Sequence, residues 1–261
     1  MIKFFRNIRK NLITEGKTTN YIKYAIGEIV LVVIGILIAL SINNWNENRK
    51  ERIEEQYLLI QLELEFKSNL EQLDEKIAIR EQMIKASLQL LEYKDNLSQR
   101  NNDSIIKYIT HTFNSPTFDP IVNDLISSGK LQLLQNNKLK QLLSFWTSEI
   151  IQVTEDEISW RKLAAEEYHP FLKVHINYRT VLANYWKNNR VKAVLIDKNQ
   201  ESELNLTPSK PTEDISKLLD IPDFEDHLAD CATWNKLINI QSVTLRNRIV
   251  EILKLIQQEV N

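Results

Sequence analysis

The feature that most constrains this chain is an apolar run near its beginning, YAIGEIVLVVIGILIAL followed by SINNW. The 19 residues from Tyr24 to Ile42 contain one charged side chain, Glu28. At 1.5 Å per residue, such a helix is roughly 28 Å long, close to the hydrocarbon thickness of a bilayer. Tyr24 stands at one end and Trp45 just beyond the other, as aromatic residues do at membrane interfaces. The run therefore predicts a transmembrane anchor over residues 21–45.

Two other interpretations of the run stay open. A cleaved signal peptide would use Ile29–Leu40 as its apolar core and the tripeptide Ala39-Leu40-Ser41 as its cleavage site. A buried helix of a soluble protein would also be apolar. The 23 residues before Tyr24 make a long leader for a signal peptide, and the run is long enough to cross a bilayer. We therefore expect an anchor that is not cleaved.

Charge is distributed unevenly along the chain. Residues 1–42 carry six Lys or Arg and two Glu, which leaves 27 of the 33 basic and 33 of the 35 acidic residues for the remainder. The positive-inside rule then predicts that residues 1–20 are cytoplasmic and that residues 46–261 lie on the other side of the membrane. The acidic remainder argues against nucleic acid as a partner, whereas the basic beginning suits an anionic lipid surface.

Residues 1–15 predict a basic amphipathic helix that lies on the inner leaflet. Apolar side chains recur there at helical spacing, and basic side chains occupy the other positions. The candidate membrane-surface residues are Lys3, Arg6, Arg9 and Lys10.

The anchor itself offers two ways to contact a partner helix. Glu28 lies about one turn inside the boundary, where its carboxylate can reach the interface or pair with a basic group of another helix. Gly35 and Ala39 form a small-xxx-small pair that permits close helix approach, so a homo-oligomer is one expected partner. The candidate anchor residues are Tyr24, Gly27, Glu28, Gly35, Ala39 and Trp45.

The rest of the chain predicts long helices, because it has only four glycines and repeated apolar residues at helical spacing. The first helix should continue from the anchor to about Tyr93. Its apolar stripe is broken at Arg80 and Ser87, which favours a bundle helix over a two-stranded coiled coil. That stripe consists of Leu59, Leu62, Phe66, Leu70, Leu73, Ile77, Ile84, Leu88 and Leu91.

Further helices are expected after this one. A short helix should start at Pro120 and end near Gly129, and residues 191–196 could be a strand or a connector. A long helix should run from Asn137 to His169 and be interrupted by Pro170. The last helix should cover 223–260. The predicted fold is all-α: a transmembrane helix continuing into one extracytoplasmic, antiparallel helical bundle over residues 46–261.

The most specific candidate for chemistry is Glu166-x-x-His169, which has the spacing of half a di-iron carboxylate site. No other histidine has a glutamate three residues before it, so a pair at the helix surface is the simpler interpretation. The inward stripe through Leu139, Leu143, Trp146, Ile150 and Val153 continues through Glu157, Trp160, Ala164 and roughly Glu167. It therefore predicts that Glu166 and His169 are at least partly exposed.

Other reactive residues have simple structural explanations. Asp223, Asp226 and His227 fit an acidic first turn of a helix, and Cys231 fits a buried small side chain. The sequence contains no P-loop, dinucleotide fingerprint, Gly-x-Ser-x-Gly or His-Glu-x-x-His motif. We therefore expect no enzyme, no cofactor and no catalytic or metal site. An aromatic group could line a pocket or fill a core: Tyr168, Phe171, Tyr178, Tyr185 and Trp186.

Two segments resemble a known family. Tyr24–Glu47, with Gly27-Glu28, Gly35 and Asn43-Asn44-Trp45-Asn46, is similar to an uncharacterised family of bacterial membrane proteins, a domain of unknown function. Leu125–Asn137 resembles a second recurrent segment of that family. The resemblance implies a single-pass inner-membrane protein with a periplasmic helical domain, and it implies no activity.

Three functions follow from these features as hypotheses. The first is a membrane-tethered helical module that binds other envelope proteins. The second is a ligand sensor in which the aromatic region binds a small molecule and the long first helix transmits a shift. The third is an enzyme that depends on a metal. A sensor would need a further partner, because only about 20 residues are expected in the cytoplasm.

Overall fold

The computed structural model describes residues 18–121, 128–188, 195, 199, 203–210 and 214–260, with side chains from residue 22 onward. Every regular element within these ranges is a helix, which confirms the all-α fold. Residues 122–127, in which the short helix after Pro120 is predicted, lie outside the described residues, as does all of 191–196 except Leu195. The chain divides into two units, Met1–Tyr57 and Leu58–Asn261.

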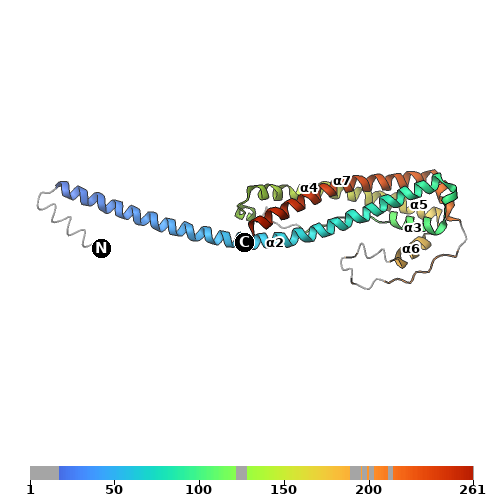
Figure 1. Ribbon diagram of the computed structural model, residues 1–261, viewed down its shortest axis with the longest axis horizontal. Helices are drawn as coiled ribbons and strands as arrows, with labels where there is room; N and C mark the ends of the chain where they lie inside the picture. Colours follow the sequence, from blue (N-terminus) through green and yellow to red (C-terminus); the bar gives the residue numbers. More distant parts are fainter. Residues whose placement is uncertain are drawn as a thin grey trace. The chain divides into compact units, whose positions relative to one another are not determined.

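The longest element is helix α2, Thr18–Asp95, with 78 residues (Figure 1). It contains the apolar run and continues without a break into the first helix of the bundle. The sequence predicts this continuity, because no proline or glycine occurs between Gly35 and Pro116. The apolar part reaches a mean hydropathy of 2.8 over 18 residues, none of which is buried. This helix is long and apolar enough to cross a membrane.

The second unit is built on α2 from Leu58 onward, α4 (Asn137–Leu163) and α7 (Pro222–Glu259). The Asn136 side chain caps α4 by accepting a hydrogen bond from the backbone N–H of Leu139. Helix α7 begins with Pro222 at a position that needs no N–H donor. The core between the three helices includes Leu59, Leu62, Phe66, Leu73, Leu139, Trp146, Val153, Leu245, Ile249, Ile252 and Ile256.

Contacts along the helices give their directions. The Phe66 and Trp146 rings lie 4.9 Å apart and Arg80 pairs with Glu157, so α2 and α4 run in the same direction. Ion pairs join Asp74 to Arg246 and Lys94 to Glu225, so α7 is antiparallel to α2.

The predicted antiparallel arrangement is therefore right for α7 and wrong for α4 against α2. The reason is the segment after Asp95, which leads back along the bundle before α4 begins. Its backbone at Asp119 and Ile121 is hydrogen-bonded to Gln72 and Asn69 of α2. A long connection can bring the chain back to the end of the bundle at which the first helix began, and the next helix then runs parallel to the first.

Shorter elements form the end of the bundle near Asp95. They are η1 (Leu97–Gln99), α3 (Asn102–Thr112), α5 (His169–His175), α6 (Tyr178–Lys187) and η5 (Ile215–Asp220), while η2 (Lys130–Leu133) precedes α4. The Asn101 side chain caps α3 by accepting a hydrogen bond from the backbone N–H of Ser104. A second apolar core there includes Leu90, Ile105, Ile109, Tyr168, Leu172, Val181, Leu219, Phe224 and Leu228.

Pro170 does not interrupt the helix, contrary to the sequence prediction. A π-helical segment, Ala164–Tyr168, joins α4 to α5, and the backbone N–H of His169 donates to the carbonyl of Ala164 five residues earlier. A π turn is wider than an α turn, so it accommodates a proline that lacks its own N–H donor. The helix therefore continues through Pro170 to His175.

Candidate functional site

Among the residues that the structure describes in the first unit, none covers the apolar part of α2. Tyr24, Ala39 and Trp45 are exposed, and Glu28 is half-buried. A Cβ atom added at Gly27 or Gly35 would meet no other atom within 4 Å. Exposing one large aliphatic side chain to water costs about 1.5–3 kcal/mol relative to burying it. A helix with this many exposed apolar residues therefore requires lipid or another protein around it.

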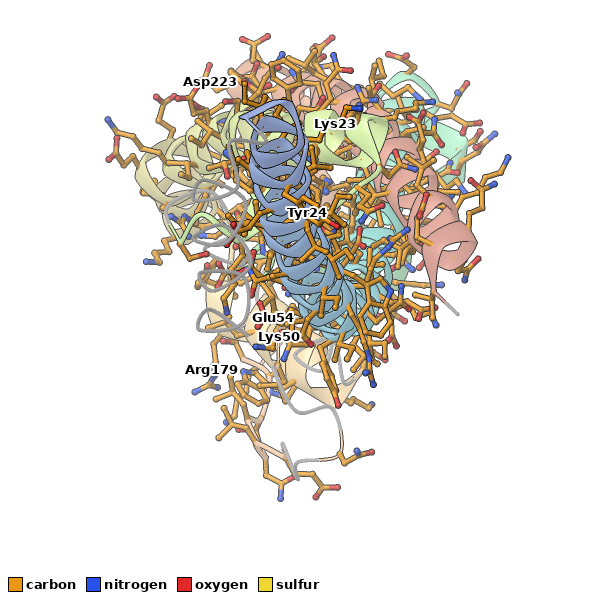
Figure 2. All side chains as sticks on the ribbon, turned by 90° about the vertical axis from the view of Figure 1, so that its left-hand side faces the viewer. Lys23, Tyr24, Lys50, Glu54, Arg179 and Asp223 are labelled. Carbon is orange, nitrogen blue, oxygen red and sulfur yellow. The ribbon has the colours of Figure 1, made fainter. Side chains whose placement is uncertain are left out.

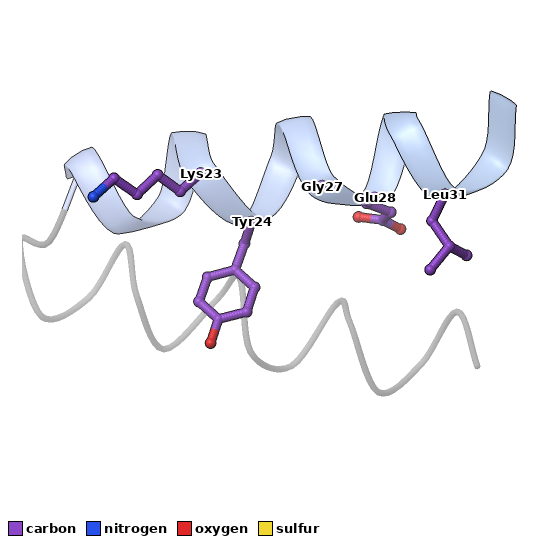
Figure 3. Close-up of a pocket in the computed structure, with 5 residues that line it drawn as sticks. All are labelled: Lys23, Tyr24, Gly27, Glu28 and Leu31. Atoms are coloured by element: carbon purple, nitrogen blue, oxygen red, sulfur yellow. The ribbon is translucent and has the colours of Figure 1, made fainter. Parts of the chain in front are cut away.

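Figure 3 shows a hollow of about 250 Å³ on this helix, lined by Lys23, Tyr24, Gly27, Glu28 and Leu31. Tyr24, Glu28 and Leu31 project from one side, and the missing side chain of Gly27 leaves room between them. The carboxylate of Glu28 thus shares a face with apolar groups. The other candidate surface residues, Lys3, Arg6, Arg9 and Lys10, lie outside the described residues.

A buried polar cluster centred on Arg80 joins the three long helices. Arg80 Nη1 donates to Glu157 Oε1 at 2.5 Å, Nε to Asn239 Oδ1 at 2.9 Å and Nη2 to Ser242 Oγ at 3.1 Å. The backbone N–H of Phe118 donates to the second carboxylate oxygen of Glu157 at 2.7 Å. All four polar side chains are buried. The cluster therefore connects α2, α4 and α7 to the segment around Phe118.

Burial and the opposite charge of the partner act against each other on the pKa of both Arg80 and Glu157. Burial lowers the pKa of Arg80, and the charge of Glu157 opposes this shift. Burial likewise raises the pKa of Glu157, against Arg80 and the Phe118 N–H. Each guanidinium nitrogen and each carboxylate oxygen already has a protein partner. Because these groups are already paired within the core, we interpret the cluster as one that specifies how the three helices pack.

In the sequence, Arg80 appears only as a break in an apolar stripe, and its role in the polar cluster is not predicted. The sequence does contain an indication of this ion pair, because Glu157 lies on the predicted inward stripe of α4. Opposite charges on two inward stripes indicate a buried ion pair. Ser87, the second residue that breaks the apolar stripe of α2, is also buried. The buried side of α2 continues to Leu90, so Leu88, which the predicted stripe includes, is exposed.

The connecting segment 114–121 is held against α2 by two side-chain amides. Asn69 accepts from the backbone N–H of Ile121 at 2.9 Å and donates to its carbonyl at 2.9 Å. Gln72 does the same at Asp119, at 2.9 and 3.1 Å. Phe118, next to Asp119, is buried in the core that the three long helices share. We call residues 114–121 the strap, because they bind across α2 and α4 without forming a regular element.

Glu166 and His169 are placed as the sequence predicts. Glu166 is exposed and His169 is partly buried, with its ring stacked on Phe113 at 4.4 Å. Burial lowers the pKa of His169, and its Nε2 is buried without a hydrogen-bond partner. In the part of the chain that the structure describes, no three His, Cys, Asp or Glu side chains are grouped as metal ligands would be. The inward line passes through Tyr168 rather than Glu167.

The aromatic group fills a core. Tyr168 and Tyr185 are buried, and Phe171 and Tyr178 pack against the same apolar cluster. The Tyr168 hydroxyl hydrogen-bonds to Thr112 Oγ1 at 2.7 Å. A cavity of about 810 Å³ lies beside this group, and none of the five predicted aromatic residues lines it. Its lining includes Asn102, Lys173, His175, Ser209, Asp214 and Lys217.

The remaining reactive residues have ordinary environments. Cys231 is fully buried, and burial raises its pKa to about 12, so the thiol stays protonated and unreactive near neutral pH. Asp223 and Asp226 are exposed in the first turns of α7. The His227 ring packs against Phe171 with a centroid separation of 4.8 Å.

Two helices expose apolar side chains on their outward faces. On α7, Ile240, Val243 and Val250 are 56%, 44% and 42% exposed. On α2, a row of four residues is exposed beyond the apolar run: Ile53, Tyr57, Ile60 and Leu64. Single exposed apolar residues are common, but rows at helical spacing suit contact with another helix.

A comparison with protein-family models finds a match over part of the chain. A model of a family of unknown function, DUF6090, matches residues 28–143, which include most of the apolar run, the first bundle helix and the strap. This supports the resemblance to an uncharacterised family. No curated protein and no solved structure matches the chain.

Proposed function

We propose that this protein is a single-pass membrane protein whose helical unit, on the extracytoplasmic side, binds other proteins and catalyses no reaction. The observation that carries the proposal is the outward apolar face of α7, formed by Ile240, Val243 and Val250. The helical unit fills its own cores, so these side chains are not needed for folding and are available to a partner. Resemblance to bacterial membrane proteins suggests an inner-membrane location with a periplasmic helical unit.

The orientation rests on charge. Six basic residues precede the end of the apolar run, so we infer that the N-terminus is cytoplasmic. The apolar run has the length of a span and is not covered by any of the described residues of its unit, which supports retention as an anchor. The lipid bilayer is then the first partner of the chain.

Isolation of the full chain in mild detergent tests the binding function. We expect a stoichiometric protein partner that is lost when Ile240 and Val243 are both changed to serine. A variant with Lys254→Ser, also on the exposed surface of α7, should keep it. Retention of the same partner by the double variant would move the binding surface elsewhere, and repeated isolation without any partner would reject the function.

The cavity of about 810 Å³ supports ligand sensing as a second candidate. Its volume is in the range of small-molecule sites, and its lining carries both lysines and aspartates, which would suit a small polar ligand: Lys173, Lys210, Lys217, Asp103 and Asp214. Native mass spectrometry of the detergent-isolated protein separates the two candidates. A bound small molecule that Lys173→Ala with Lys217→Ala abolishes would favour sensing.

A further inference from the structure

The row of exposed apolar side chains on α2 points to a specific occupant. Ile53, Tyr57, Ile60 and Leu64 are 47%, 68%, 45% and 66% exposed and follow one another in steps of four, three and four. These steps place all four on one side of the helix, opposite the buried Leu59, Leu62 and Phe66. The outward side of a bundle helix is normally polar, so this row, which we call the α2 seam, needs a partner.

Lipid does not suit the α2 seam if the span ends near Ile42. Ile53 follows 11 residues later, roughly 16 Å along the helix, and Tyr57, in the same unit, follows after roughly 22 Å. The polar layer of a leaflet is only about 5–8 Å thick. The seam therefore lies beyond the headgroups, in water, unless a protein covers it.

We propose that the α2 seam pairs with the same seam of a second copy of this chain in a parallel two-stranded coiled coil. This rests on the proposed membrane anchoring, since two anchored copies share one orientation. The steps of four and three are those of alternating d and a positions, with Ile53 and Ile60 at d and Tyr57 and Leu64 at a.

Charge complementarity supports pairing with an identical helix. In this register Arg49 is a g residue, and Glu54, five residues later, is the e residue that meets it across a parallel dimer. The dimer thus contains two Arg49–Glu54 contacts related by symmetry. The next g and e positions are Gln56 and Gln61, whose amides bring no like charges together. Figure 2 labels Glu54 and also Lys50, a charged residue that precedes the first seam residue, Ile53.

The size of the seam sets how strong the pairing can be. Four partly exposed side chains offer on the order of 400 Å² per copy, about half of the 800 Å² that each partner contributes to a standard interface. Such a seam holds two freely diffusing molecules weakly. Anchoring both copies in one membrane raises their effective concentration, so the pair forms there.

Disulfide cross-linking of the full chain in membranes tests the pairing. In a Cys231→Ala background, cysteine is placed at Tyr57 or Ile60, or at exposed Glu155 of α4 as a control. After mild oxidation, we expect a covalent dimer of twice the chain mass at positions 57 and 60, at least about fivefold above position 155. Equal yields at all three positions would overturn the proposal.

Charge reversal identifies the partner. In the Ile60→Cys background, Arg49→Glu and Glu54→Arg should each lower the dimer yield, and the two together should restore it, because the pairs are then only exchanged. If both single changes and the double change lower the yield alike, the pairing is refuted. Cross-linking to a protein of different mass would likewise refute self-pairing, while the proposed binding function would stand.

Discussion

Replacement of Arg80 by leucine should destabilise the helical unit by about 3–5 kcal/mol, because it leaves Glu157 as a buried charge without its ion partner. Asn239 and Ser242 lose a hydrogen-bond donor at the same time. For a unit of about 200 residues, each kcal/mol corresponds to roughly 2–4 °C in Tm. The expected fall in Tm is therefore roughly 6–20 °C.

The loss should depend on pH. Burial already raises the pKa of Glu157, and Arg80 opposes the rise, so the Arg80→Leu variant should raise this pKa further. A carboxyl group with a raised folded-state pKa favours the folded state most below its unfolded pKa of about 4.3, and this contribution is lost as pH rises through the folded pKa. The variant should therefore recover part of its stability between pH 7 and pH 5.

Thermal unfolding of the full chain in mild detergent, followed by tryptophan fluorescence, measures these effects. The control is Arg246→Leu, since the Arg246–Asp74 pair is 39% and 44% exposed and such pairs contribute at most about 1 kcal/mol. Arg80→Leu combined with Glu157→Leu should be more stable than Arg80→Leu alone, because the orphaned charge is removed. A double variant no more stable than the single one, or a single variant within 1 °C of the control, would refute the assignment.

Three further outcomes are expected. Burial lowers the pKa of His169 below the unfolded value of about 6.5, so the free energy of unfolding should fall between pH 7 and pH 5 as this histidine is forced to protonate. The variant His169→Phe should flatten this profile in pH-dependent unfolding. As a control, Glu166→Ala should change stability by less than about 0.5 kcal/mol. Asn69→Leu should cost about 1–3 kcal/mol, since two backbone groups of the strap lose their partner, and faster amide hydrogen exchange at Ile121 would report it. Residues 47–261 expressed alone should give a far-ultraviolet circular dichroism spectrum dominated by helix, and a dominant strand signal would contradict the fold.

Sequence patterns located the long helices well. The predicted last helix at 223–260 is Pro222–Glu259 in the structure, and the helix from Asn137 begins at that residue. Both have apolar stripes of helical period and start signals that act locally, so nearby residues suffice to predict where they begin. The inward stripe of α4 was correct as far as Ala164.

Long-range contacts account for what the sequence did not predict. Asn69 and Gln72 bind the strap backbone some 50 residues away, and no local pattern indicates this pairing. The strap returns the chain to the start of the bundle, so the parallel direction of α4 was also missed. The π-helical segment before Pro170 placed Tyr168 on the inward line and kept the helix intact, where a proline rule predicts an end.

The most direct test of membrane anchoring is a reporter enzyme, active only outside the cytoplasm, fused after Asn261 and assayed in membranes washed at high pH. The proposed orientation predicts that the activity remains in the membrane pellet, because the apolar run would anchor the chain and the basic N-terminal residues would keep that end inside. Activity released into the soluble fraction would indicate a cleaved or unanchored chain. A silent reporter on an intact fusion protein would place the helical unit in the cytoplasm and contradict the proposed orientation.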